Sequence, residues 1–164
     1  MTTNSFLTFK IGNELFATNV SKVHNILEMQ RITEIPDAPN YFKGVINVRG
    51  TVLPVADLHI KFNMPALEFT KDTCIIVTDV LIENDIISIG ILVDGVSEVM
   101  DITENLILPP PSIEAKYKSK FIHGMVQSGE QFILLINIDT VFSTDEIINL
   151  QQTEDNINLL NNTE

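Results

Sequence analysis

Cysteine is almost absent from the sequence, since Cys74 is the only one among 164 residues. No disulfide can form within the chain, which suits a reducing compartment such as the cytosol. Long apolar runs are absent too: the run FILLI at 132–136 falls far short of the roughly 20 residues that a membrane span needs. The start of the chain, MTTNSFLTFK, lacks the basic and then apolar pattern of a signal peptide. We therefore expect a cytoplasmic protein with no direct membrane insertion.

Basic residues are also scarce. Lysine and arginine together number 10 against 22 aspartates and glutamates, which gives a formal net charge of −12. Nucleic-acid binding needs a cationic face that displaces counterions from phosphates, and an anionic membrane surface attracts the same kind of face. The charge balance therefore argues against nucleic acid and against anionic lipid as partners.

Catalytic motifs are missing as well. The sequence holds no Walker loop, no G-x-S-x-G and no H-E-x-x-H, and His24, His59 and His123 are isolated from one another. Cys74 opens an apolar run, where a buried small hydrophobe is the more common role than a nucleophile. We predict a protein without enzymatic activity, catalytic residues, metal or cofactor. A hydrolase that uses Cys74 or a histidine is kept as an alternative.

The sequence is rich in short apolar stretches with turn residues between them. Apolar residues make up 45% of the chain. Paired stretches separated by turn residues predict β-hairpins, and many short strands favour an all-β sandwich or barrel. Pro54 cannot donate to a strand ladder, so we expect it at an edge or a bulge. The predicted hairpins pair residues 6–11 with 15–17, 45–48 with 52–55, 74–77 with 86–93, and 125–126 with 132–136.

The chain also repeats itself at an offset of about 76 to 80 residues. The matches follow in the same order in both halves: VSKV and VSEV, then an apolar residue before proline, an aromatic before glycine, and a strand that closes on aspartate. The matched residues are Val20 and Val96, Ile26 and Ile102, Ile35 and Leu108, Phe42 and Phe121, and Asp57 and Asp139. We predict one domain over 1–150, built from two copies of a small barrel at roughly 6–70 and 72–142 that pack together.

Two segments carry helix signals. Asn19 is a good N-cap for a short helix near 20–27, where Val20, Val23 and Leu27 share one face. Ser143 and Glu146 have capping-box spacing and predict a C-terminal helix. Residues 151–164 are acidic and polar, and they either extend that helix or form a tail.

The stretch NVRGTVLPVADL at 47–58 places a charge between two apolar strands. Only two arginines occur in the chain, Arg31 and Arg49. Arg49 and Gly50 can simply form a tight turn, with glycine supplying a positive φ and the arginine in water. Alternatively, a stiff hairpin presents the planar guanidinium fork to a partner, a role in which arginine is enriched. Local physics alone leaves both interpretations open.

The same region carries a family resemblance. Residues 40–58, NYFKGVINVRGTVLPVADL, closely resemble the signature of the CheW family, the coupling proteins of bacterial chemotaxis. The similarity continues through 59–62, 90–99 and 132–138, and covers about residues 6 to 150. The G-V-x-N-x-R-G-x-x-x-P-x-x-D-L pattern is long and specific.

The resemblance implies a fold of two SH3-like five-stranded β-barrels with a hydrophobic groove between them, and no catalytic activity. It implies a scaffold that links the cytoplasmic tips of methyl-accepting chemoreceptors to the histidine kinase CheA, whose regulatory domain is built like CheW. Such a scaffold is recruited to the inner face of the membrane through the receptors. The positions that match the partner-binding surface are Val23, Gly44, Arg49 and Gly50, with Asn47 shaping the hairpin.

The sequence departs from the family pattern at Asn25 and at the polar pair Thr18-Asn19, where the family's stretch often begins with an apolar residue. The family commonly has V-x-E-I where Val23-His24-Asn25-Ile26 stands here, and Asn25 cannot supply the charge of that glutamate. Arg49 therefore either pairs with another carboxylate, of which Glu28 and Asp57 are the nearest in sequence, or is free to meet a partner.

A small-barrel module that binds a peptide or ligand of another pathway is the alternative function.

Overall fold

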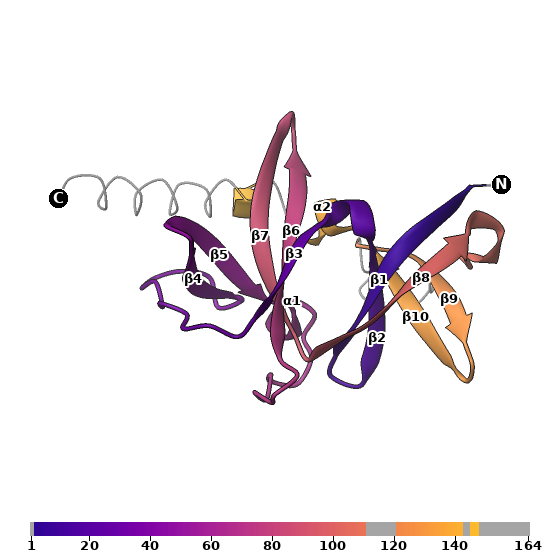
Figure 1. Ribbon diagram of the computed structural model, residues 1–164, viewed down its shortest axis with the longest axis horizontal. Coiled ribbons are helices and arrows are strands. Elements are labelled where there is room, and N and C mark those ends of the chain that lie inside the picture. The colour runs from indigo at the N-terminus through magenta and orange to yellow at the C-terminus, as the bar shows by residue number, and fades with distance from the viewer. Residues whose placement is uncertain (1, 111–120, 143–144, 148–164) are drawn as a thin grey trace.

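The chain folds into two curled five-stranded β-sheets that lie side by side, and short helices follow some of the strands (Figure 1). The computed structural model describes residues 2–110, 121–142 and 145–147. The predicted all-β class is confirmed. Within the described residues no helix has the length and apolar character to cross a membrane. In chain order the strands are β1 (Thr3–Ile11), β2 (Glu14–Asn19), β3 (Val23–Glu28), β4 (Phe42–Val48), β5 (Thr51–Asp57), β6 (Cys74–Ile82), β7 (Asp85–Val93), β8 (Gly95–Thr103), β9 (Ile122–Ser128) and β10 (Gln131–Ile136).

Each sheet combines strands from both halves of the chain. One sheet has the order β8-β1-β2-β10-β9 and the other β3-β6-β7-β5-β4. The first hairpin of each half, β1–β2 or β6–β7, thus inserts into the sheet that the other half completes. The insertion is made by parallel pairing, β2 with β10 and β7 with β5. Neither 6–70 nor 72–142 closes a sheet by itself, so the predicted contiguous half-barrels are corrected to two barrels that exchange hairpins.

The internal repeat is visible in the backbone hydrogen bonds. An isolated antiparallel bridge joins Thr33 to Val45 in one barrel and Leu108 to Met125 in the other. The Asp57 N–H donates to the Tyr41 carbonyl, and the Asn137 N–H donates to the Phe121 carbonyl, both at 2.7 Å. Phe121 therefore corresponds to Tyr41 rather than to Phe42, and Asn137 rather than Asp139 corresponds to Asp57.

The predicted helix near 20–27 is wrong. Asn19 does act as a cap, because its side chain accepts from the Ser21 N–H at 2.9 Å, but only the 3₁₀ turn η1 (Val20–Lys22) follows. From Val23 the chain is strand β3, which pairs with β6. Pairing with a buried apolar strand outweighs the local cap, because tertiary context overrides weak helix propensity.

The predicted C-terminal helix falls mostly outside the described residues. Residues 145–147 are helical, and Ile147 among them is fully buried. Residues 143–144 and 148–164, which include the predicted tail at 151–164, lie outside the part of the chain that the structure describes.

Two hairpins of the second sheet pair with each other over a short stretch only. Strand β5 pairs with β7 only at Val55, Ala56 and Asp57, directly after Pro54. Proline has no N–H to donate and so fits a position where the pairing ends, but the equivalent strands β2 and β10 also pair at only three positions and contain no proline. Beyond this stretch the hairpin of β4 and β5 diverges from the β6–β7 hairpin, which projects beyond its neighbours (Figure 1).

The main apolar core joins the two barrels. Phe9, Ile11 and Phe16 come from the first sheet, and they share one buried cluster with residues such as Ile76 and Ile91 of the second. Smaller clusters fill each barrel separately. Burial of this shared surface fixes the barrels against each other, at roughly 25 cal/mol for each Å² of apolar area removed from water.

Candidate functional site

The turn between β4 and β5 is tightly braced. Arg49 and Gly50 both have positive φ, 53° and 85°, as in the two-residue turns that match the twist of a hairpin. The Asn47 side chain accepts from the Gly50 N–H at 2.7 Å. Asn47 therefore shapes the turn, and it holds Arg49 in a conformation that a non-glycine residue seldom adopts.

Arg49 is exposed and makes no ion pair or side-chain hydrogen bond within the described part of the chain. The two carboxylates nearest in sequence do not serve it. Asp57 is buried and contacts Lys43 at 3.8 Å and His59 at 3.0 Å. Among the described residues Glu28 makes no ion pair with Arg49. The guanidinium is thus presented on a stiff turn with its hydrogen-bond donors available.

Gly44 has a backbone role. It is buried, its φ is 145°, and a Cβ at this position would lie 2.1 Å from the carbonyl oxygen of Thr33. The close approach allows Val45 and Thr33 to exchange two hydrogen bonds of 2.9 Å, which close the barrel. Gly44 therefore supports the hairpin through this backbone contact with Thr33, and it has no side chain with which to contact a partner protein.

Val23 lies away from that turn. It is the first residue of β3, half-buried and packed against the main core. Of the five predicted residues, the structure thus brings Asn47, Arg49 and Gly50 together, places Gly44 three positions down the same strand, and leaves Val23 on the strand at the other end of the sheet order.

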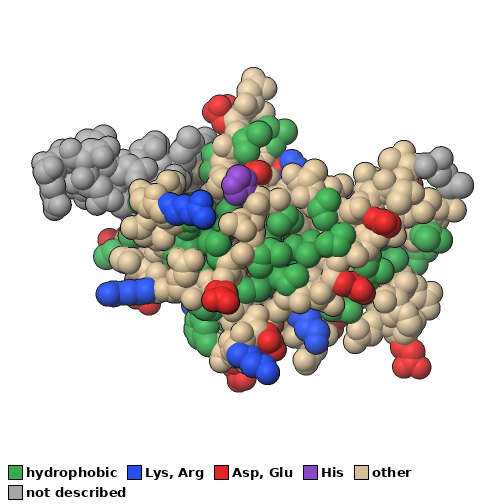
Figure 2. Space-filling view, viewed as in Figure 1, with side chains coloured by type: hydrophobic (Ala, Val, Ile, Leu, Met, Phe, Trp, Pro, Cys, Tyr) green, Lys and Arg blue, Asp and Glu red, His purple; other side chains and the backbone are tan. Residues whose placement is uncertain are grey.

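The sequence reasoning expected a hydrophobic groove between the barrels and named Val23 for the partner-binding surface, but it did not name the exposed apolar residues of this region. Figure 2 shows hydrophobic side chains gathered in the middle of one face, where β3, β1 and β8 cross between the barrels. The exposed large apolar residues of these elements and of η1 are Val20, Ile26 and Val99, with exposed fractions of 36%, 44% and 59%. We call these three residues the apolar strip. The repeat aligned Ile26 with Ile102, which is buried, so no sequence signal separated the exposed member from the buried one.

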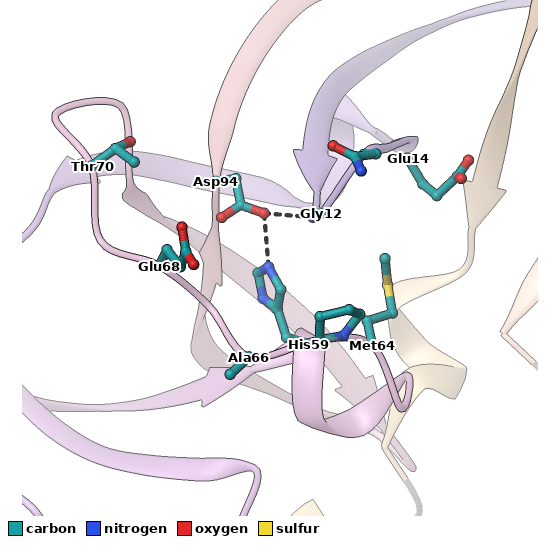
Figure 3. Close-up of a pocket in the computed structure, with 10 residues that line it drawn as sticks. Gly12, Glu14, His59, Met64, Ala66, Glu68, Thr70 and Asp94 are labelled. Atoms are coloured by element: carbon teal, nitrogen blue, oxygen red, sulfur yellow. Dashed lines mark hydrogen bonds and ion pairs between the residues drawn. The ribbon is translucent and has the colours of Figure 1, made fainter.

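A cavity of 570 Å³ lies between the β1–β2 turn and the loop after α1 (Leu58–Lys61). His59 at its wall is buried, and both ring nitrogens are engaged. Nδ1 contacts Asp57 at 3.0 Å. Nε2 contacts Asp94 at 2.7 Å (Figure 3). Asp94 also accepts from the Gly12 N–H. Since Gly12 and Asp57 belong to different barrels, this network links them. No ring nitrogen is left to act as a base in the cavity.

The remaining reactive groups do not assemble a catalytic site. Burial raises the pKa of the Cys74 thiol, and the nearby Asp72 charge adds to the rise, so the less reactive thiol form is favoured. Burial lowers the pKa of His123. Within the described residues no hydrogen bond joins Cys74 to a histidine, and no group of three His, Cys, Asp or Glu side chains could hold a metal ion.

The chain is similar to proteins of one known family. A family model described as "CheW-like domain" matches residues 5–146. This chain belongs to the CheW-like domain family. The chemotaxis protein CheW of Klebsiella aerogenes is 32% identical over 142 residues, which cover 87% of this chain and 83% of that protein. The chemotaxis protein CheW of Rhizobium meliloti is 34% identical over 140 residues, covering 85% and 88%.

A solved structure from this family has a similar fold. The crystal structure of the scaffolding protein TtCheW from Thermoanaerobacter tengcongensis matches this CheW-like chain with a TM-score of 0.76 and 30% identity, covering 88% of this chain and 96% of that one. The two-barrel architecture of the CheW-like chain is thus shared with a protein described as a scaffold. Family and structure together support a chemotaxis coupling scaffold.

Proposed function

We propose that this CheW-like chain is a non-enzymatic adaptor that links the cytoplasmic tips of chemoreceptors to a CheA-type histidine kinase. It works in the cytoplasm, at the inner face of the membrane where the receptors hold it. The family match over 5–146 carries the proposal. The engaged nitrogens of His59 and the raised pKa of the Cys74 thiol disfavour a hydrolase.

Two surface features supply the means of binding. Arg49 offers a charged fork with no ion-pair partner in the described chain, on a turn braced by Asn47. The apolar strip offers exposed hydrophobic area of the kind that marks protein interfaces. We assign the partner-binding surface to the strip and to the hairpin residues Asn47, Arg49 and Gly50. Val23 and Gly44 support this surface indirectly, Val23 by packing against the main core and Gly44 by allowing the bridge to Thr33.

The test is a titration of Arg49→Ala against a receptor tip fragment and against the regulatory domain of the kinase, each alone. A guanidinium that meets its partner in a desolvated centre loses roughly 2–4 kcal/mol on truncation, and a solvated rim charge loses under about 1 kcal/mol. We expect at least tenfold weaker binding to one partner or both, about 1.4 kcal/mol, with melting unchanged.

Arg49→Lys is the matched control, because it keeps the charge but not the bidentate fork, and it should restore binding only in part. If both variants bind both partners like the parent at moderate salt, Arg49 serves only its turn and this assignment of the surface is wrong.

A further inference from the structure

Phe142 and Glu146, which follow α2 (Ile138–Val141), both contact Tyr41 at the base of the Arg49 hairpin. The ring centroids of Phe142 and Tyr41 lie 5.9 Å apart. The Lys61 ammonium lies 4.6 Å from the Tyr41 ring centroid and bonds to the Glu146 carboxylate at 2.5 Å. The Tyr41 hydroxyl donates to that same carboxylate. We call Tyr41, Lys61 and Glu146 the polar junction.

The polar junction sits where the hairpin is anchored. Tyr41 directly precedes β4, and its carbonyl accepts from the Asp57 N–H at the end of β5. Because β5 pairs with β7 only after Pro54, the hairpin above is held by its own pairing and by the Thr33 bridge. The direction in which the hairpin points is therefore set at its base.

The repeat provides an internal comparison. At the equivalent junction of the other barrel, Phe121 stands where Tyr41 stands here, and it stacks on Phe62 with centroids 4.3 Å apart at 12°. No hydroxyl or charge takes part in that ring contact. Among the described residues this second junction is thus made from apolar rings, whereas the junction beneath Arg49 uses a hydroxyl, an ammonium and a carboxylate.

The groups of the polar junction are shielded from water. The side chains of Lys61 and Glu146 are 19% and 24% exposed. Burial raises the pKa of Tyr41, and the hydrogen bond to Glu146 and its charge raise it further, so the hydroxyl keeps its proton and stays a donor. Partly buried, charge-assisted hydrogen bonds of this kind fix geometry more than exposed ion pairs do.

We propose that the polar junction is a positioning site: it couples Glu146 to the hairpin base and thereby sets how Arg49 meets its partner. The inference rests on the proposed function of the hairpin. Tyr41, Lys61 and Glu146 act through Arg49 and need not touch the partner themselves.

The experiment is a double-mutant cycle on the full chain. Tyr41→Phe copies the solution used at Phe121, so it should fold, and Glu146→Gln keeps an acceptor while it removes the charge. We expect each to weaken binding to the receptor tip or kinase domain at least threefold with nearly unchanged melting. Neither should weaken it further once Arg49→Ala is present, because coupled residues are not additive.

The control is Ser5→Ala, which also removes a hydroxyl that donates to a carboxylate, that of Asp101, but in the other barrel. It should leave hydrogen exchange in the hairpin unchanged. Tyr41→Phe should instead speed exchange of the amides at 44–54 in the free protein, which is measured without any partner.

The outcomes separate this inference from the proposed function. Unchanged exchange at 44–54 in Tyr41→Phe and Glu146→Gln would overturn the positioning role, whatever Arg49 does. So would a loss of binding that persists at full size in the Arg49→Ala background. If Arg49→Ala itself binds like the parent, the assigned surface fails, and faster exchange at 44–54 alone would not rescue the link to Arg49.

Discussion

Asn47 is the residue on which the Arg49 turn depends. Its side-chain oxygen accepts from the Gly50 N–H and compensates the left-handed conformation of Arg49. We expect Asn47→Ala to cost about 1 kcal/mol, the usual size of one hydrogen bond, and to lower the melting temperature by roughly 2–4 °C. Differential scanning calorimetry measures this directly.

Asn47→Asp is the control for that prediction, since the aspartate keeps an oxygen acceptor at the same position. It should melt close to the parent. An Asn47→Ala variant that melts like Asn47→Asp would show that the turn holds itself without the side chain.

The signature residues could be found from the sequence because the turn chemistry is local. Arg49-Gly50 between two apolar stretches predicts a hairpin, and the structure has one. The sequence left open whether Arg49 pairs with Asp57 or Glu28 or is free to meet a partner, because the positions of these two carboxylates depend on the fold. Asp57 turned out to be engaged by His59 and Lys43. The polar junction was invisible for the same reason, since Tyr41 and Glu146 are far apart in the chain.

The β4–β5 hairpin contains two glycines that do different work. Gly44 to Ala would place a Cβ 2.1 Å from the Thr33 oxygen, whereas nothing lies within 4 Å of a Cβ at Gly50. We expect Gly44→Ala to break the Thr33 bridge and cost several times more stability than Gly50→Ala, whose cost is the positive φ alone, about 1–2 kcal/mol. Chemical denaturation of both variants gives the comparison, and equal midpoints would contradict it.

Strand β3 carries the clearest test of the apolar strip. Ile26 is 44% exposed and belongs to no core cluster, whereas Val23 is half-buried against the main core. Ile26→Lys should weaken partner binding about tenfold or more with unchanged melting. Val23→Lys should lower the melting temperature as well, because it brings a charge into partly buried surroundings.

Leu106→Lys serves as the control, since Leu106 is 60% exposed in the 3₁₀ turn η2 (Glu104–Leu106), outside the strip. It should bind and melt like the parent. Equal binding by Ile26→Lys and Leu106→Lys would mean that the strip is not part of the interface.

Individual strands and hairpins were easier to predict than which strands lie beside one another in a sheet. Apolar runs and turn residues located the four hairpins, because these signals act within a few residues. The helix near 20–27 failed because a correct cap at Asn19 was outweighed by pairing of β3 with β6, which lies far along the chain. The exchange of the β1–β2 and β6–β7 hairpins between the two barrels was not predictable. The alternation of apolar and polar residues shows which face of a strand is buried, but it does not show which strand lies beside it.

The whole molecule is two barrels locked together rather than two linked units. Exchanged hairpins, a shared core and the Asp57–His59–Asp94 network all cross between the barrels. A rigid pair of barrels can hold two surfaces at a fixed separation, which is what an adaptor between receptor and kinase requires. The repeat predicted two barrels correctly, but their interlocking had to come from the structure.

The most direct test of the adaptor role is a bridging assay. Receptor tip fragments are immobilised, a CheA-type kinase is added, and the retained kinase is measured with and without this chain at moderate salt. We expect the kinase to be retained well above background only when the chain is present, and we expect Arg49→Ala to reduce the retained amount at least several-fold while Ser5→Ala does not. Retention of the kinase that is the same with and without the chain would contradict the adaptor role.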